Sequence, residues 1–189
     1  MRHLFLLAAL FCACISYAQI RVQERLPKSK TGFALTTAKT RAKIYYDVND
    51  ALVIKRSAEL FARDIQMVTG QKPELIQKRE RAKALVIVGT IEKNQWICEL
   101  AQKGKIDIRP LQGAWERYLI QTVDNPSPGV AKALVIAGSD RRGAAYGLFS
   151  ISEMMGVSPW YWWGDVPVKT HKALYVDAQV GGQAVRKTR

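Results

Sequence analysis

Hydrophobic positions along this 189-residue chain fall into short runs and helical stripes, separated by polar and glycine-containing turns. Two near-continuous apolar runs, residues 83–88 and 132–137, overlap the two copies of a repeated sequence, AKALVI, at 82–87 and 131–136. Each run leads through glycine into Thr90 or Ser139. Such runs are typical of strands that are covered on both faces of a sheet. We predict two neighbouring core strands, because so short a repeat does not establish a duplicated unit.

Three segments have hydrophobic positions at helical spacing. The clearest follows a candidate N-cap at Asn49 or Asp50 and ends at Gly70. Its apolar stripe consists of Ile54, Ala58, Phe61, Ile65 and Val68. Further helices are predicted over residues 92–102 and from residue 141 to about residue 155.

Shorter stretches rich in β-branched and aromatic residues predict the remaining strands. They lie at residues 42–47, 73–77 and 117–123, with a short edge strand at 33–35. A turn of hairpin composition fills residues 124–129. The order of elements predicts an α/β fold, with a mixed sheet of about five strands and helices mainly on one face.

Residues 1–18 have the pattern of a secretory signal peptide: Arg2 and His3, an unbroken apolar run, then small residues before Gln19. We therefore expect an exported protein, periplasmic or extracellular; a lipoprotein signal and an uncleaved anchor are the alternatives. No later apolar run reaches the ~18 residues of a membrane span. We divide the rest into a polar leader (19–41), an α/β domain (42–168) and a C-terminal tail (169–189).

The formal net charge of +13 narrows the choice of partners. Such a charge attracts polyanions, including acidic polysaccharides. The lysines and arginines are scattered, and neither a basic helix nor an RNA-binding aromatic signature occurs, so we predict no nucleic-acid partner.

We find no catalytic or metal-ligating set in the sequence. Cys98 is the only cysteine after the signal peptide, and we interpret it as a small buried hydrophobe. His171 is the only histidine there, in a polar stretch, and we expect a solvated loop residue. Glu153 and Asp165 lack the pattern of a glycosidase pair. We predict no catalytic residue, metal or cofactor.

The stretch from residue 138 to 169 departs furthest from a generic packed domain. Ser139 or Asp140 is suited to N-cap the helix that follows, and the arginines after them need a carboxylate partner or an interface. Gly143 and Gly147 lie four residues apart on one helical face, and predict close approach of this helix to the sheet.

Four consecutive aromatic residues, Trp160, Tyr161, Trp162 and Trp163, follow this helix. They cannot all be buried in one strand, because alternate side chains face opposite ways. Two interpretations stay open: an interface with another domain, and direct stacking on sugar rings. Asp165 joins them as a candidate in the extended exit towards residue 168.

The whole stretch, GSDRRGAAYGLFSISEMMGVSPWYWWGDVPVK, resembles part of the N-terminal domain of glycoside hydrolase family 115, the xylan α-1,2-glucuronidases. The resemblance covers roughly residues 42–176. The matching positions are Gly138, Ser139, Asp140, Arg142, Gly143, Tyr146, Gly147, Ser152, Glu153, 156–163 and 165–167.

The resemblance implies a small α/β domain that precedes a catalytic (β/α)8 barrel in an exported hydrolase. The family's catalytic carboxylates lie in the barrel, which releases (4-O-methyl)glucuronic acid from xylan. The sequence up to Arg189 contains no first barrel strand, so we expect this chain to be inactive alone, through a truncation, a frameshift or a fragment boundary. Expected partners are the missing barrel and acidic xylan; the alternative is a stand-alone carbohydrate-binding module that uses 160–163.

Overall fold

The computed structural model describes residues 20–178. The predicted signal peptide and residues 179–189 of the predicted tail lie outside the described residues. Of the helices within 20–178, none combines the length and the apolar character that a membrane crossing needs.

A five-stranded mixed sheet forms the centre of the molecule, in the order β4-β3-β5-β7-β6. Neighbours among the first four strands are parallel, and β6 is antiparallel to β7. The strands are β3 (Lys43–Tyr46), β4 (Leu75–Ile76), β5 (Ala82–Thr90), β6 (Tyr118–Ser127) and β7 (Val130–Gly138). This confirms the predicted α/β class, and the two AKALVI copies are neighbouring, parallel strands.

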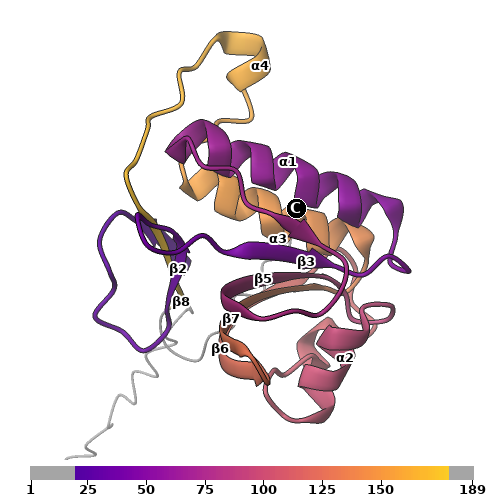
Figure 1. Cartoon of the computed structure of the whole chain (residues 1–189). Helices are drawn as coiled ribbons and strands as arrows, with labels where there is room; N and C mark the ends of the chain where they lie inside the picture. Colours follow the sequence, from indigo (N-terminus) through magenta and orange to yellow (C-terminus); the bar gives the residue numbers. More distant parts are fainter. Residues whose placement is uncertain (1–19, 179–189) are drawn as a thin grey trace, which may run out of the picture.

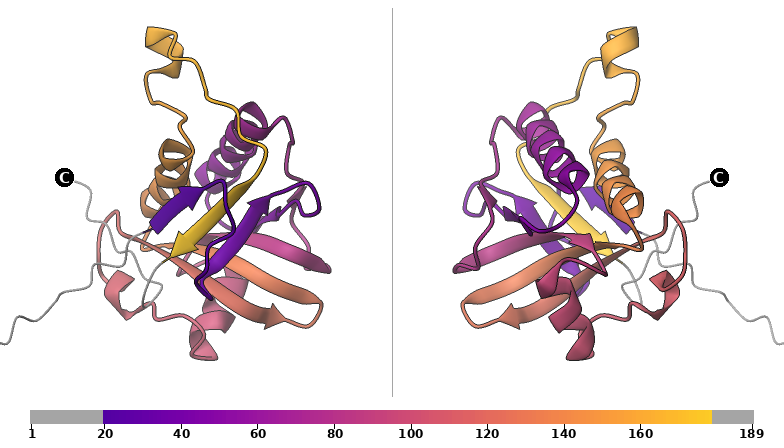
Figure 2. Two further views of the ribbon diagram at one scale, coloured as in Figure 1. Left: turned by 90° about the vertical axis from the view of Figure 1, so that its left-hand side faces the viewer. Right: turned by 90° about the vertical axis from the view of Figure 1, so that its right-hand side faces the viewer.

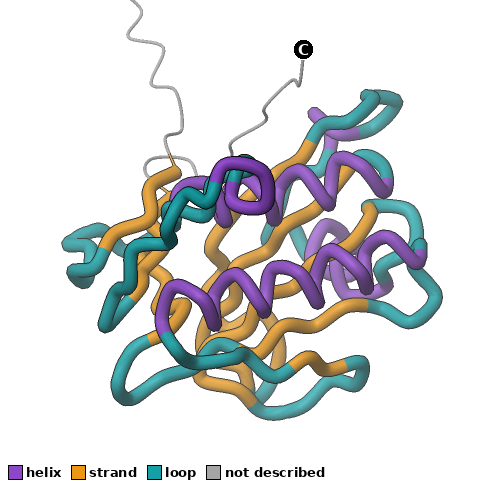
Figure 3. Tube along the Cα trace, turned by 90° about the horizontal axis from the view of Figure 1, so that it is seen from above, coloured by secondary structure: helices purple, strands orange, loops and turns teal. Residues whose placement is uncertain are grey.

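Two long helices, α1 (Leu52–Thr69) and α3 (Arg141–Met154), lie side by side on one face of this sheet, as Figures 1 and 3 show. The shorter α2 (Gln95–Gln102) packs on the opposite face. Val86 and Val88 of β5 point towards α1 and α3, whereas Leu85 and Ile87 point towards α2. Both faces of β5 are buried, which is why its sequence is continuously apolar.

A second sheet of three strands packs beside the first. Strand β8 (Leu174–Ala178) lies between β1 (Ile20–Gln23) and β2 (Gly32–Thr36) and is antiparallel to both. Figure 2 shows this small sheet beside the main sheet and its helices. Phe33, Leu35 and Val176 belong to the same buried core as α1 and α3. The predicted polar leader (19–41) contains β1 and β2, and the predicted tail (169–189) contains β8. In the structure these two segments pair with each other.

The ends of the elements differ from the predictions in three places. Helix α1 begins after Ala51 without a side-chain cap, because the Asp50 carboxylate is bonded to Thr90 instead. Helix α2 begins later than predicted, where Asn94 accepts hydrogen bonds from two backbone N–H groups. Strand β6 extends to Ser127, so the hairpin turn is shorter than expected.

Candidate functional site

The four aromatic residues form part of a projection between α3 and β8. Helix α3 ends at Met154, and Gly156, two residues later, has a φ of 92° in the left-handed region. The Gly156 and Val157 N–H groups donate to the carbonyls of Glu153 and Ser152. This Schellman arrangement stops the helix and redirects the chain outward. The four-residue helix α4 (Tyr161–Gly164) follows and stands away from the two sheets (Figures 1 and 2).

The base of the projection is fixed to the body of the domain. Val157 at its start and Val168 near its end pack against the core beneath α1 and α3. The His171 backbone N–H donates to the Val68 carbonyl at 2.8 Å, and its Nδ1 lies 2.6 Å from Glu24 Oε1. His171 lies in a loop, as expected, but its side chain is only 15% exposed, and it joins the loop to α1 and to the leader.

The tip of the projection presents aromatic surface to solvent. Trp160 is 66% exposed and Trp163 is 86% exposed, while Tyr161 is half-buried. Asp165 is also exposed, in the left-handed conformation that ends α4. The structure therefore places Trp160, Trp163 and Asp165 where another domain or a sugar chain can reach them.

Strand β7 ends at Gly138 and α3 begins at Arg141, so the first part of residues 138–169 packs against the main sheet. The Asp140 Oδ1 atom accepts from the Arg142 and Gly143 N–H groups at 2.8 Å each, which is the predicted N-cap. The Arg142 guanidinium pairs with Glu116 at 2.8 Å, which supplies the expected carboxylate partner. An added Cβ at Gly143 would collide with the Arg117 carbonyl oxygen, and one at Gly147 would lie 2.6 Å from Ile136 Cγ2.

The carboxyl end of β5, Gly89-Thr90, binds an internal carboxylate. At Gly89-Thr90, the Thr90 N–H and hydroxyl both donate to Asp50, at 2.7 and 3.0 Å. Asp47 lies near it and accepts from the backbone of Gln95. Parallel α/β sheets commonly bind ligands at the carboxyl ends of their strands. Here Asp50 takes the N–H group that a bound phosphate would use.

On the α2 face, charged side chains pair with each other. The Arg79 guanidinium pairs with both oxygens of Glu99, at 2.6 and 2.8 Å, and lies 4.8 Å from the centre of the Trp96 ring. Its hydrogen bonds lower the pKa of the Glu99 carboxyl. Burial raises the pKa of the Cys98 thiol, which fits a structural cysteine better than a reactive one.

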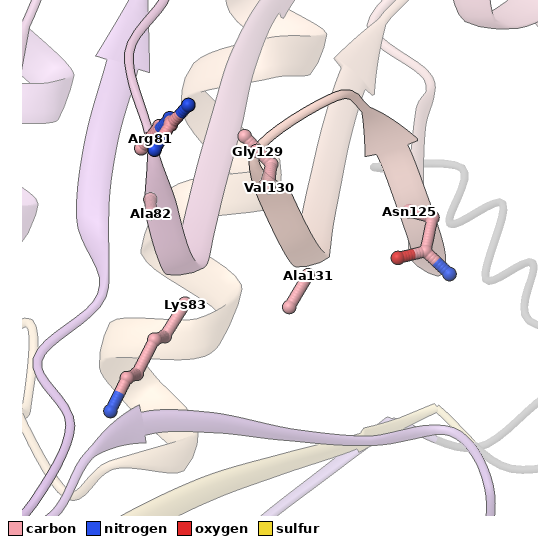
Figure 4. Close-up of a pocket in the computed structure, with 7 residues that line it drawn as sticks. All are labelled: Arg81, Ala82, Lys83, Asn125, Gly129, Val130 and Ala131. Atoms are coloured by element: carbon pink, nitrogen blue, oxygen red, sulfur yellow. The ribbon is translucent and has the colours of Figure 1, made fainter.

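A cavity of ≈ 480 Å³ lies at the amino ends of β5 and β7 (Figure 4). Arg81 and Lys83 both line it, but Figure 4 shows their side chains pointing away from each other. Two cations that diverge cannot clamp one anion, so we assign no site to this cavity.

Within residues 20–178, no group of three or more His, Cys, Asp or Glu side chains is arranged to hold a metal ion. Trp115, an exposed aromatic residue that the sequence did not single out, borders two further cavities. Its neighbours in the sequence, Gly113 and several charged residues, are typical of an exposed loop and could have identified it as a surface tryptophan.

No protein-family model matches the chain, and no curated protein matches it. Among solved structures, it is similar to one described as "a novel family GH115 4-O-Methyl-alpha-glucuronidase, BtGH115A, with specificity for decorated arabinogalactans". The identity is 29% and the TM-score 0.60, over 79% of this chain and 17% of that one. The chain thus spans only a small part of this relative.

Two other glycoside hydrolase structures show weaker similarity. One is CpGH84D, with 11% identity and a TM-score of 0.48, over 85% of this chain and 22% of that one. The other is the GH20 β-N-acetylhexosaminidase from Streptomyces coelicolor A3(2), with 12% identity and a TM-score of 0.36, over 85% and 25%. At these TM-scores neither carries an argument about this chain.

The fold and the first comparison define a class: a small α/β domain similar to part of a glycoside hydrolase. The particular relative is a GH115 α-glucuronidase, which supports the GH115-like relationship drawn from residues 138–169.

Proposed function

We propose that the chain is the N-terminal, non-catalytic domain of an exported α-glucuronidase-like glycoside hydrolase that acts on glucuronoxylan. The parent reaction is hydrolysis of the α-1,2 bond to (4-O-methyl)glucuronic acid. The observation that carries the proposal is the similarity to BtGH115A, which covers most of this chain and a small part of that enzyme.

Two features of the site support a domain that works beside a catalytic one. The carboxylates at the sheet edge, Asp50 and Asp140, are bonded to backbone N–H groups of their own chain. The most exposed large apolar side chains of the projection, Trp160 and Trp163, have the character of an interface. We assign this surface to contact with the barrel of the parent enzyme.

The activity test uses the purified chain with glucuronoxylan and with decorated arabinogalactan, the substrate in the description of the relative. We expect no release of (4-O-methyl)glucuronic acid above a blank from either polysaccharide. An intact GH115 enzyme is the positive control. Clear turnover by the chain alone would contradict a non-catalytic role.

The DNA downstream of the codon for Arg189 provides a second test. We expect one of its reading frames to encode a barrel sequence. A downstream region without such a sequence in any frame would count against a parent hydrolase.

A stand-alone carbohydrate-binding module is the second candidate, favoured by the exposure of Trp163 at the tip of the projection. Affinity electrophoresis in gels that contain xylan separates the two candidates. Retardation that Trp163→Ala abolishes would favour the module, and unretarded migration of the wild-type chain would reject it.

A further inference from the structure

A loop between α2 and β6 holds Trp115 at the rim of two adjoining cavities. One cavity, of ≈ 500 Å³, lies where β5 and β7 end, and Glu92, Ser139 and Asp140 contribute to its lining. The other, of ≈ 450 Å³, is bordered by Arg109 and Arg117. Residues 112–115 line both, so a molecule lying on Trp115 has access to each.

The backbone of this loop is held in place from both sides. The Glu116 N–H donates to Asp140 Oδ2 at 2.7 Å, and the Arg117 N–H donates to Ser139 Oγ at 3.0 Å. Glu116 has a φ of 55°, a left-handed conformation that is unfavourable for a residue with a side chain. These bonds fix the chain directly after Trp115, and the Ala114 N–H, directly before it, donates to the Leu111 carbonyl at 3.2 Å. The Trp115 side chain remains 78% exposed.

A large aromatic side chain that is fixed at its backbone and open at its face is suited to stacking. Trp gives more flat apolar area than any other residue, and cavities beside it can accept the substituents of a stacked ring. The C–H face of a pyranose ring is an apolar surface of matching size. Gln112, which lines both cavities, supplies an amide that can both donate to and accept from sugar hydroxyls.

The two cavities differ in charge, which orients the ligand. Arg109 is bonded to Asp107 through two of its nitrogens, whereas the Arg117 guanidinium makes one long contact, 3.5 Å, with the Pro110 carbonyl. Arg117 is therefore the better placed of the two to receive a carboxylate, which guanidinium groups bind through paired hydrogen bonds.

In the other cavity Asp140 is bonded to backbone N–H groups through both of its oxygens, so Glu92 is the carboxylate there that suits hydroxyl groups. Carboxylate oxygens accept hydrogen bonds from sugar hydroxyls, and they repel phosphate. This disfavours a nucleotide, whose base could also stack on a tryptophan.

We propose that Trp115 is the platform of a binding site for an acidic oligosaccharide, with a pyranose ring stacked on the indole and a uronate carboxylate on Arg117. The site is separate from the aromatic projection of α4. The choice of a uronate ligand rests on the proposed function, but binding at Trp115 is measured without a catalytic domain, so the two proposals can fail separately.

Isothermal titration calorimetry with the full chain tests the site. The probes are xylotriose that carries one 4-O-methylglucuronic acid, unsubstituted xylotriose, and uridine monophosphate. We expect the acidic oligosaccharide to bind about tenfold more tightly than the neutral one. No detectable binding of either sugar, or tighter binding of the nucleotide, would overturn the proposal.

Two variants assign the binding to named groups. Trp115→Ala should weaken binding of both sugars about tenfold or more, while the control variant Leu26→Ala, at a highly exposed apolar residue outside both candidate sites, leaves it unchanged. Arg117→Gln should remove the preference for the acidic sugar and keep binding of the neutral one. Thermal unfolding of each variant shows whether it is folded; loss of binding in Trp163→Ala but not in Trp115→Ala would place the site on α4 and contradict the proposal.

Discussion

Gly143 and Gly147 show what single residues contribute to this fold. Their spacing in the sequence predicts a helix face pressed against the sheet, and in the structure each faces a neighbour that leaves no room for a Cβ. The partners of other residues could not be predicted. Asp50 bonds to Thr90, forty positions away, and no local pattern announces such a contact.

Gly143→Ala should destabilise the protein by about 2 kcal/mol, because the overpacking outweighs the gain in helix propensity. The added methyl group would push against the Arg117 carbonyl, which also accepts from the Ser139 N–H. Chemical denaturation measures the change in the free energy of unfolding. The control is Gly164→Ala in α4, where a Cβ would meet Val166 at an ordinary 3.7 Å; an equal loss in both variants would refute the packing explanation.

Asp64 on α1 should make stability fall as pH rises. Its carboxyl is buried, and burial raises its pKa above the ordinary 3.8 despite the neighbouring Arg63. Between the unfolded and the raised folded pKa, the folded state keeps a proton that the unfolded state has lost, so the free energy of unfolding decreases with increasing pH.

Asp64→Asn removes this titration. Denaturant unfolding of both proteins from about pH 4 to about pH 7 should show the wild type losing stability relative to the variant as pH rises through this window. A constant difference between the two proteins across the window would contradict the assignment.

At the scale of elements, some helices and strands are predicted from their own local sequence, whereas others form only by pairing with distant segments. The apolar runs of β5 and β7 and the stripe of α1 are strong local signals, and these elements were predicted. The small sheet was not predicted as a unit, although a strand at 33–35 was. Strand β8 has only five residues, and it is stabilised by pairing with β1 and β2, more than 130 positions away in the chain.

Val176→Asp tests the contribution of β8 to the domain. Val176 is fully buried in the core beneath α1 and α3, so a carboxylate there should cost about 4 kcal/mol or more, or prevent cooperative unfolding. The neighbouring Tyr175 is half-buried, and Tyr175→Asp should cost clearly less. Similar unfolding midpoints for the two variants would mean that β8 is not integral to this core.

At the scale of the whole molecule, the domain combines a compact body with one projection. The body buries its apolar residues on both faces of the main sheet. The projection keeps Trp160 and Trp163 in solvent, and soluble proteins seldom leave such surface without a partner.

The isolated chain should self-associate through this projection. The double variant Trp160→Ser/Trp163→Ser should shift the protein towards monomer in sedimentation velocity, with a change in unfolding free energy within about 0.5 kcal/mol. Leu26→Ser, at another highly exposed apolar residue, is the control and should have no such effect. A wild-type chain that stays monomeric at high concentration would count against the interface.

The sequence by itself determined the strands of the main sheet, the helices that pack on it, the end of α1 at Gly70 and the N-cap of α3 at Asp140. These depend on residues within a few positions of one another, through strand alternation, helical spacing and backbone capping. Only the tertiary structure placed β8 between β1 and β2, set the Asp50 carboxylate against Thr90, and left Trp115 over two cavities. Each of these is a contact between distant segments, whose partners are specified by the packing of the whole chain.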